Sequence, residues 1–257
     1  ALSMQGRSDA HSFIEAFAGD DRYIVDYLVD EVLHRQPDHI RRFLLQTSIL
    51  DRLNSSLCDA VTDQQEGGVL LETLERGNLF VIPLDNKRHW YRYHHLFADV
   101  LHAHLLKERP QEIAMLHQRA SVWYEQNELT AVAIHHAFAA DDFARAARII
   151  ELAWAEMDRS RQSVEWLRWA NKLPPELLQT RPVLCLGMAW ASLDTGQLEA
   201  AERWLSAAEH CLETAVGLVI ADEEEFRYLP GSIAAARTYH ALALGDMPAT
   251  VNYARQA

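Results

Sequence analysis

Apolar residues in the first part of the chain recur at helical spacing. The segment 21–33 places its apolar residues on one face and its acidic residues on the other, which predicts a helix. A second helix is expected from Pro37, which suits the first turn of a helix, to about Leu50. A short helix should follow at 54–61.

Glycines mark the next boundaries. Gly67 and Gly68 are expected to break the chain, and a helix is predicted over 69–76. This helix should end at Gly77, because glycine readily takes the backbone conformation that follows a helix.

The pattern changes from helical to alternating after Gly77. Residues 79–84 form a short apolar run, 85–88 are typical of a turn, and 89–93 alternate with aromatic side chains, which predicts a β-hairpin. This order of elements, in which helices are followed by the hairpin and then by a helix from near His94, predicts a winged-helix domain whose wing is 79–93.

A weak internal repeat follows Pro110, and no strand pattern remains there. Residues 142–149, 197–204 and 245–254 each combine small residues with a large one, and 127–133 are a looser copy. Small residues let paired helices approach closely, as in tetratricopeptide-like helical hairpins. The predicted helices are 110–126, 130–139, 142–156, 161–172, 182–195, 198–213, 226–244 and from 247 onward.

The predicted fold class is mainly α: a winged-helix domain with a small β-hairpin, followed by an α-superhelix of tetratricopeptide-like helical hairpins. We expect a helical end of a preceding module or a linker at 1–36, the winged helix at 37–109 and the repeats at 110–257. The chain starts without an initiator methionine and ends inside a predicted helix, so we expect a piece of a longer protein.

Composition narrows the functional class. The chain has 37 acidic and 24 basic residues, and its net charge of −13 leaves no basic stripe, which argues against direct nucleic-acid binding. No apolar run approaches the roughly 18 residues of a membrane-spanning helix, and no signal peptide is visible. The three cysteines, Cys58, Cys185 and Cys211, are odd in number and far apart in the sequence. This argues against a disulfide framework or a cysteine zinc site and indicates a reducing cytoplasm.

Motifs for catalysis are missing from the sequence. It contains no P-loop glycine-lysine pattern, GxGxxG, HExxH or GxSxG, so we expect no catalytic residues and no enzyme. Histidines crowd the segment 89–104, but His95 and His102 share a helical face while His94 and His104 point elsewhere. We therefore expect no metal.

Six tryptophans lie between residues 123 and 204. They suit packing between repeats, and they also suit an aromatic surface that binds a small molecule or a partner protein. Under the second interpretation the candidate binding residues are Trp166, Trp169, Trp190 and Trp204. The acidic run 222–225 is expected to be a solvated loop between repeats.

Several segments of the first half resemble the MalT-like family of large ATP-binding LuxR-type transcriptional regulators. They are DRYIVDYLVDEVL at 21–33, FLLQTSILDRL at 43–53, LCDAV at 57–61, LLETLERGNLFVIPLD at 70–85 and YRYHHLFADVL at 91–101. The resemblance implies a nucleotide-binding STAND ATPase module before Ala1, and a LuxR-type helix-turn-helix after Ala257. ATP or ADP is thus implied for the longer protein, and no cofactor for this chain alone.

One residue role is implied by the same resemblance. STAND proteins carry a Met-His-Asp-like motif in the winged helix, whose histidine contacts the phosphates of the nucleotide, and Tyr93-His94-His95-Leu96 is similar to it. His94 would be that histidine. His95 replaces the acidic residue of the motif, which leaves the role of the acid open, and a local capping or packing role for His94 is the alternative.

The sequence therefore predicts the regulatory part of a cytoplasmic transcription regulator. Its repeats would sense a small-molecule inducer or a regulatory protein, and its winged helix would couple this to nucleotide state and to self-association in the active form. DNA would be bound only through the absent helix-turn-helix, and no membrane is involved. The alternatives are a freestanding helical-repeat scaffold for protein binding and, less in keeping with the sequence, an all-helical enzyme.

Overall fold

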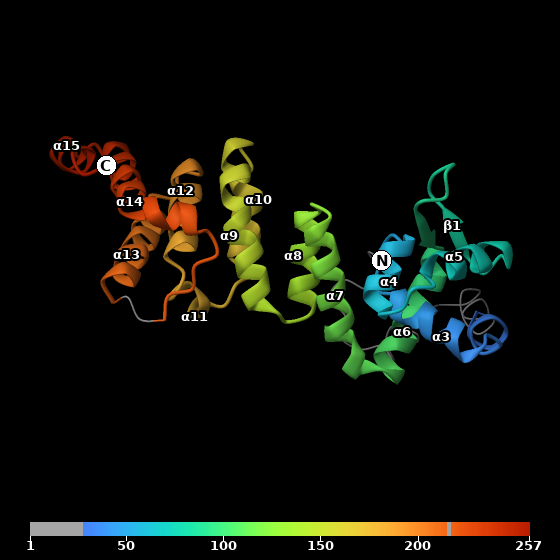
Figure 1. Cartoon of the computed structure of the whole chain (residues 1–257). Coiled ribbons are helices and arrows are strands. Elements are labelled where there is room, and N and C mark those ends of the chain that lie inside the picture. The colour runs from blue at the N-terminus through green and yellow to red at the C-terminus, as the bar shows by residue number, and fades with distance from the viewer. Residues whose placement is uncertain (1–27, 215–216) are drawn as a thin grey trace, which may run out of the picture. The chain divides into compact units, whose positions relative to one another are not determined.

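A computed structural model describes residues 28–214 and 217–257 (Figure 1). The predicted mainly helical fold with one small β-hairpin is confirmed. The helix expected at 21–33 falls largely outside the described residues, and its last part, Leu28–Leu33, is π-helical. No helix among the described residues is long and apolar enough to cross a membrane.

Backbone contacts divide the chain into two compact units. The first comprises residues up to Glu128 with Ala139–Asp141, and the second comprises Leu129–Phe138 with Asp142–Ala257. The first unit contains α3 (Asp38–Thr47), α4 (Ser55–Thr62), α5 (Gly67–Arg76), β1 (Val81–Pro83), β2 (Tyr91–Tyr93), α6 (His95–Glu108), a 3₁₀ turn (Pro110–Glu112) and α7 (Ile113–Gln126).

The first unit has the winged-helix arrangement that the sequence predicted. Strands β1 and β2 pair antiparallel with Val81 opposite Tyr93. Leu53 adds a bridge to the outer side of β2, exchanging two backbone hydrogen bonds of 2.8 Å with Tyr91. The buried Tyr93 hydroxyl lies 2.7 Å from the Thr47 hydroxyl and so ties the wing to the end of α3.

Gly67 and Gly68 do not break the chain as predicted, because they form the first turn of α5. The Gly67 amide donates a 2.7 Å hydrogen bond to the Asp59 carboxylate. A Cβ atom at Gly67 would lie 2.8 Å from both Asp59 Oδ1 and the Ser55 carbonyl oxygen, so only glycine fits without displacement. The glycine marks a close approach of two helices.

Helix α7 packs against the winged helix although the sequence placed it with the repeats. The Arg119 guanidinium donates to Asp63 Oδ2 at 2.8 Å and to the Val61 carbonyl at 3.2 Å, and both partners lie at the end of α4. The Trp123 ring meets that of Trp90 at 6.4 Å between centroids. The contacts of α7 thus extend the first unit to Glu128, and the domain boundaries at 36/37 and 109/110 stay predictions.

The second unit is a succession of helices (Figure 1). They are α8 (Thr130–Ala139), α9 (Phe143–Arg159), α10 (Ser163–Ala170), α11 (Pro175–Leu178), α12 (Pro182–Asp194), α13 (Leu198–Thr214), α14 (Glu223–Ala243) and α15 (Met247–Ala254). Helix α12 contacts α9, α10, α13 and α14, and every residue from Pro182 to Ala189 is buried. A helix covered on several sides is typical of stacked helical hairpins.

The acidic run 222–225 is not the solvated loop that the sequence predicted. Asp222 is the N-cap of α14 and accepts a 2.9 Å hydrogen bond from the Glu225 amide. Glu223, Glu224 and Glu225 occupy the first turn, where carboxylates interact favourably with the helix dipole. The helix therefore begins three residues before the predicted position, 226.

Candidate functional site

His94 lies between the wing and helix α6. Its backbone continues β2, since the amide donates a 2.8 Å hydrogen bond to the Phe80 carbonyl. Its own carbonyl accepts from Ala98 and so starts α6, which makes His94 the N-cap. The side chain makes no capping hydrogen bond, so the imidazole is not used to satisfy the helix end.

The His94 side chain is half-buried beside two other rings. The Phe80 ring lies 6.4 Å away and the His95 ring 4.3 Å away, between centroids. Burial lowers the pKa of His94, and the nearby cationic groups of His95 and Arg92 lower it further. His94 is thus neutral near pH 7 and offers one N–H donor at a helix N-terminus, where anions are favoured.

The remaining candidate histidines do not assemble a metal site. Among the residues that the structure describes, no three His, Cys, Asp or Glu side chains come together as metal ligands. His104 instead lies 2.9 Å from Glu108 on its own helix.

Trp166 lies in the core of the second unit. Its side chain has 0% exposure, and its indole N–H donates a 2.8 Å hydrogen bond to the Ile150 carbonyl. It packs against the Trp154 ring at 4.8 Å and against Gly187, where a Cβ atom would lie 3.0 Å from the indole. A ligand cannot reach this ring in the present packing, so Trp166 acts in the packing of α9, α10 and α12.

The other three candidate tryptophans, Trp169, Trp190 and Trp204, are each half-buried. The structure pairs Trp190 of α12 with Tyr239 of α14, whose ring centroid lies 5.4 Å away and whose side chain is largely exposed. Trp190 and Tyr239 therefore form an accessible aromatic pair in the second unit. Sequence reasoning did not single out Tyr239, because its neighbour comes from a helix almost fifty residues away.

Sequence reasoning also overlooked a buried ion pair. Glu151 of α9 has no exposed side-chain surface, and its Oε2 lies 3.0 Å from Arg181 Nη1. Its Oε1 accepts hydrogen bonds from the backbone amides of Ala221 at 2.9 Å and Asp222 at 3.4 Å. One carboxylate thus fastens the segment before α14 to α9.

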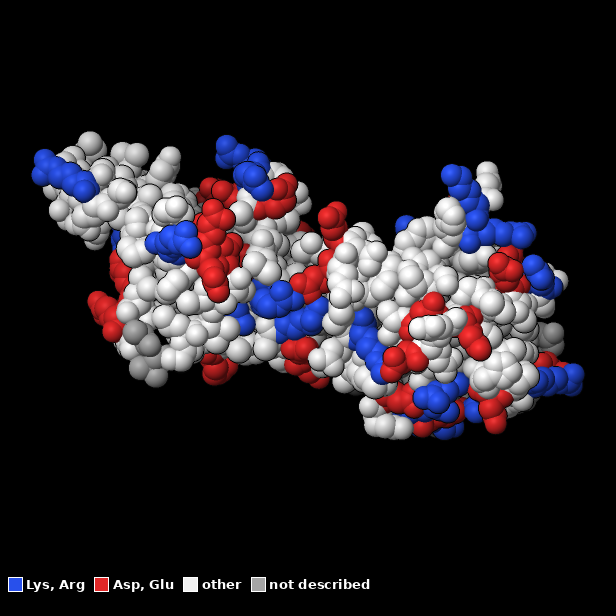
Figure 2. All heavy atoms as spheres, in the orientation of Figure 1, with Lys and Arg blue, Asp and Glu red and all other residues white. Residues whose placement is uncertain are grey.

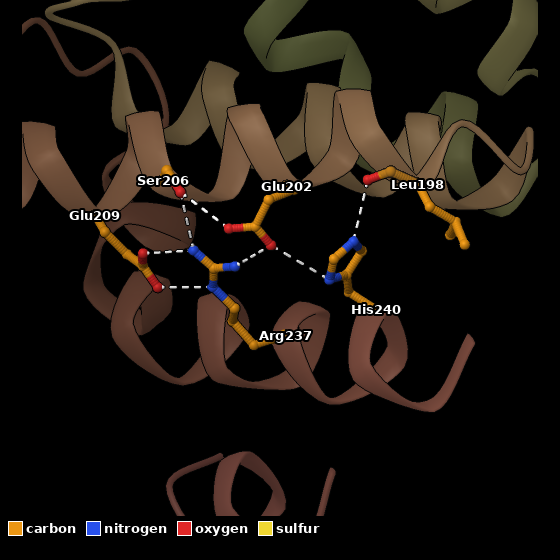
Figure 3. A network of polar contacts seen from close by, with 6 residues as sticks. All are labelled: Leu198, Glu202, Ser206, Glu209, Arg237 and His240. Carbon is orange, nitrogen blue, oxygen red and sulfur yellow. Dashed lines mark hydrogen bonds and ion pairs between the residues drawn. The ribbon is translucent and has the colours of Figure 1, made fainter. Parts of the chain in front are cut away.

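A second polar network joins α13 to α14 (Figure 3). Arg237 donates to both oxygens of Glu209, at 2.9 and 2.7 Å, and to Glu202 at 2.6 Å. His240 lies one turn further along α14, with Nδ1 3.4 Å from Glu202 and Nε2 3.0 Å from the Leu198 carbonyl. The carboxylates raise the pKa of Arg237 and the guanidinium lowers that of Glu202, so both groups are charged. The Arg237 guanidinium finds its partners within the protein, on α13, which indicates a structural network.

Comparisons with known proteins agree with the winged helix. Residues 29–113 match the MalT winged helix domain. The chain is 32% identical over 266 residues to the HTH-type transcriptional regulator MalT of Klebsiella pneumoniae subsp. pneumoniae, covering 98% of this chain and 28% of that protein. The MalT of Vibrio parahaemolyticus is 32% identical over 207 residues, which is 80% of this chain and 23% of that protein.

A protein with a different name matches the same region. The serine/threonine-protein kinase PknK of Mycobacterium tuberculosis is 32% identical over 216 residues, covering 81% of this chain and 20% of the kinase. The chain thus spans between 20% and 28% of the length of these relatives. Residues 29–113 thus match the MalT winged helix domain, and the chain is similar to MalT regulators over most of its length.

Proposed function

We propose that this chain is a regulatory relay of a cytoplasmic, signal-responsive transcription regulator and carries no catalytic group of its own. The observation that carries the proposal is that this region is similar both to HTH-type transcriptional regulators and to a protein kinase. A transcriptional regulator acts through a DNA-binding domain, whereas a protein kinase acts through a catalytic domain. The region that both kinds of protein share is suited to a regulatory task common to them.

The winged helix would couple regulation to a nucleotide. In this proposal ATP or ADP is bound by a STAND-type module of the longer protein, and the half-buried neutral imidazole of His94 donates a hydrogen bond to a phosphate oxygen. The unused side-chain donor at the start of α6 supports this role. The contact would hold the resting state closed.

The helices of the second unit would receive the signal. Trp190 with Tyr239, and the half-buried Trp169 and Trp204, supply aromatic surface for a small-molecule inducer or a regulatory protein. An inducer acts by binding the open state better than the closed one, and a tenfold preference shifts the balance by about 1.4 kcal/mol. Self-association of the open form, and DNA binding through a separate LuxR-type helix-turn-helix, would complete the response.

The substitution His94→Ala in a full-length protein that contains this chain tests the proposal. Loss of a hydrogen bond to a charged phosphate, worth about 1.5–3 kcal/mol, should weaken nucleotide binding by roughly 10- to 140-fold and raise activity without inducer. Nucleotide affinity is measured by titration calorimetry, and output by a transcription assay.

The matched control is His89→Ala, which removes an exposed imidazole from the same hairpin. It should leave both readouts unchanged. Equal behaviour of the two variants would contradict the phosphate contact. A parent protein with no response to nucleotide would instead favour the freestanding scaffold.

A further inference from the structure

Two cysteines that lie far apart in the sequence meet in the second unit. The Cys185 thiol, on α12, donates to the Leu178 carbonyl at 3.2 Å. The Cys211 thiol, on α13, donates to the next carbonyl, that of Gln179, at 2.9 Å, and lies 4.0 Å from the Leu178 carbonyl oxygen. The two thiols therefore converge on the end of α11 from neighbouring helices, and both sulfurs lie within 4.0 Å of the Leu178 carbonyl oxygen.

The surroundings make the two sulfurs unequal. The proximity of the two sulfurs lowers the pKa of Cys211 and raises that of Cys185, because the Cys185 thiol can turn its proton from the carbonyl toward a Cys211 thiolate. A thiol with a lowered pKa is the better nucleophile near neutral pH, and a neighbouring thiol can resolve its oxidised form. All three cysteines are buried, so burial does not distinguish them. Burial raises the pKa of Cys58 in the first unit, whereas Cys211 has the Cys185 thiol beside it, which lowers its pKa.

We propose that Cys185 and Cys211 are a redox-sensitive thiol pair that closes into a reversible disulfide between α12 and α13 when the protein meets a hydroperoxide. This inference does not depend on the proposed function. It assigns a modification site to a pair of residues that the sequence presented as unrelated free cysteines.

Disulfide formation is a two-electron oxidation of the two thiols, and the peroxide accepts the electrons. With hydrogen peroxide, the Cys211 thiolate attacks one oxygen and the O–O bond breaks. The leaving hydroxide takes up the proton that Cys211 released on ionisation, which gives water and a sulfenic acid on Cys211. The Cys185 sulfur then attacks the Cys211 sulfur and forms the S–S bond. The sulfenic oxygen leaves as a second water, taking up the proton that Cys185 gives up. The two thiols lose two electrons in total, and the hydroperoxide gains them.

Disulfide formation would remove both thiol donors from the Leu178 and Gln179 carbonyls. The next residues along the chain anchor the segment before α14, because the Thr180 carbonyl accepts a 2.8 Å hydrogen bond from Val219 and Arg181 pairs with Glu151. Glu151 in turn holds the Ala221 amide. Oxidation would therefore loosen the attachment of this segment.

The test oxidises the folded full chain with hydrogen peroxide, blocks remaining thiols with N-ethylmaleimide in denaturant, and maps tryptic peptides without reduction. Arg203 separates Cys185 from Cys211, so a disulfide appears as a linked pair of peptides that dithiothreitol separates. Cys58 is the internal control and should be recovered alkylated. Hydrogen exchange of the Val219 and Ala221 amides should become at least about tenfold faster in the oxidised protein.

Variants sharpen the result. Cys185→Ser should abolish the linked peptides and leave Cys211 as a sulfenic or sulfinic acid, whereas Cys58→Ser should form the link as the native chain does. Recovery of all three cysteines as thiols would overturn the proposal. So would a bond to Cys58, a bond between two chains, or a link that forms only after denaturation.

Discussion

At the scale of single residues, the second unit contains an ion pair that is almost completely withdrawn from water. The Glu151 side chain has no exposed surface and that of Arg181 has 5%. Each ion loses its hydration, and this loss is offset only by the mutual attraction and by the backbone donors that fill the remaining carboxylate sites. Removing one partner leaves the other charge buried without compensation.

We expect Glu151→Gln to lower the free energy of unfolding of the second unit by about 3–5 kcal/mol, because Arg181 loses its counter-charge. Urea denaturation at pH 7 measures the effect. The double replacement of Glu151 and Arg181 by methionine should recover most of the loss.

The exposed pair of Glu156 and Arg159 provides the comparison, and Glu156→Gln should change the stability by less than about 0.5 kcal/mol. If Glu151→Gln lowered the free energy of unfolding by less than about 1 kcal/mol, the pairing of Glu151 with Arg181 would not be needed to offset the burial of the Arg181 charge.

At the scale of elements, an ionic clamp joins the first and last helices of the winged helix. Arg41 of α3 donates to both oxygens of Glu108 at the end of α6, at 2.7 and 2.6 Å, and His104 lies 2.9 Å from the same carboxylate. Burial on its own would raise the pKa of Glu108. The hydrogen bond and charge of His104 and those of Arg41 outweigh burial, and the pKa is lowered from its ordinary value of 4.5.

This shift predicts an acid-sensitive contact. The folded-state pKa of Glu108 lies below the unfolded one, so the stabilisation is fully present above about pH 4.5 and is lost as the pH falls through the folded value. Hydrogen exchange of α3 and α6 amides, followed from pH 6 to pH 3, should show protection decreasing below pH 4.5.

Glu108→Gln should remove this part of the pH dependence and lower protection at pH 6. Glu72→Gln, which breaks an exposed pair with Arg76 within α5, should leave the profile unchanged. An identical profile for the native chain and Glu108→Gln would refute the clamp.

Helix boundaries show where sequence signals suffice at this scale. The ends of α8, α12 and α13 fall within about one residue of their predicted positions, because turn residues and apolar periodicity agree there. The predicted starts of α14 and α5 were wrong, because a capping side chain or a close contact between helices outweighed the usual preference of the residues at that position. Asp222 capped α14 early, and Gly67 entered α5 because α4 lies against it.

At the scale of the whole molecule, the charge of this chain differs from the clustered positive charge that is typical of proteins that bind duplex DNA. Acidic and basic side chains are intermixed among uncharged ones on the face shown in Figure 2, and the net charge is −13. Duplex DNA is bound through many phosphate contacts by clustered cations. The basic residues Lys87 and Arg88 at the tip of the wing are flanked by Asp85 and Glu75, and Arg88 pairs with Glu75.

We therefore expect the purified chain not to retard duplex DNA in a mobility-shift assay at 0.1 M salt, because repulsion from the net negative charge exceeds the attraction of the wing. Replacing Lys87 and Arg88 by alanine should change nothing. A shift that the double variant abolishes would identify the wing as a DNA contact and contradict the relay proposal.

The sequence by itself determined the helix and hairpin order, the winged helix and the MalT-like resemblance. These follow from local signals, namely apolar period, turn residues and contiguous motifs, which do not depend on how distant segments meet. The position of His94 at a strand-to-helix junction belongs to the same class, since β2 and α6 are both read from their own residues.

The tertiary structure alone decided which distant residues meet. The pairing of Cys185 with Cys211, of Glu151 with Arg181, and of Trp190 with Tyr239 depends on how helices stack, and no single helix encodes it. The same stacking buried Trp166 against Gly187 and left the other three candidate tryptophans, Trp169, Trp190 and Trp204, half-buried. Periodicity gives the face of a helix that is covered, but only packing gives the neighbour that covers it.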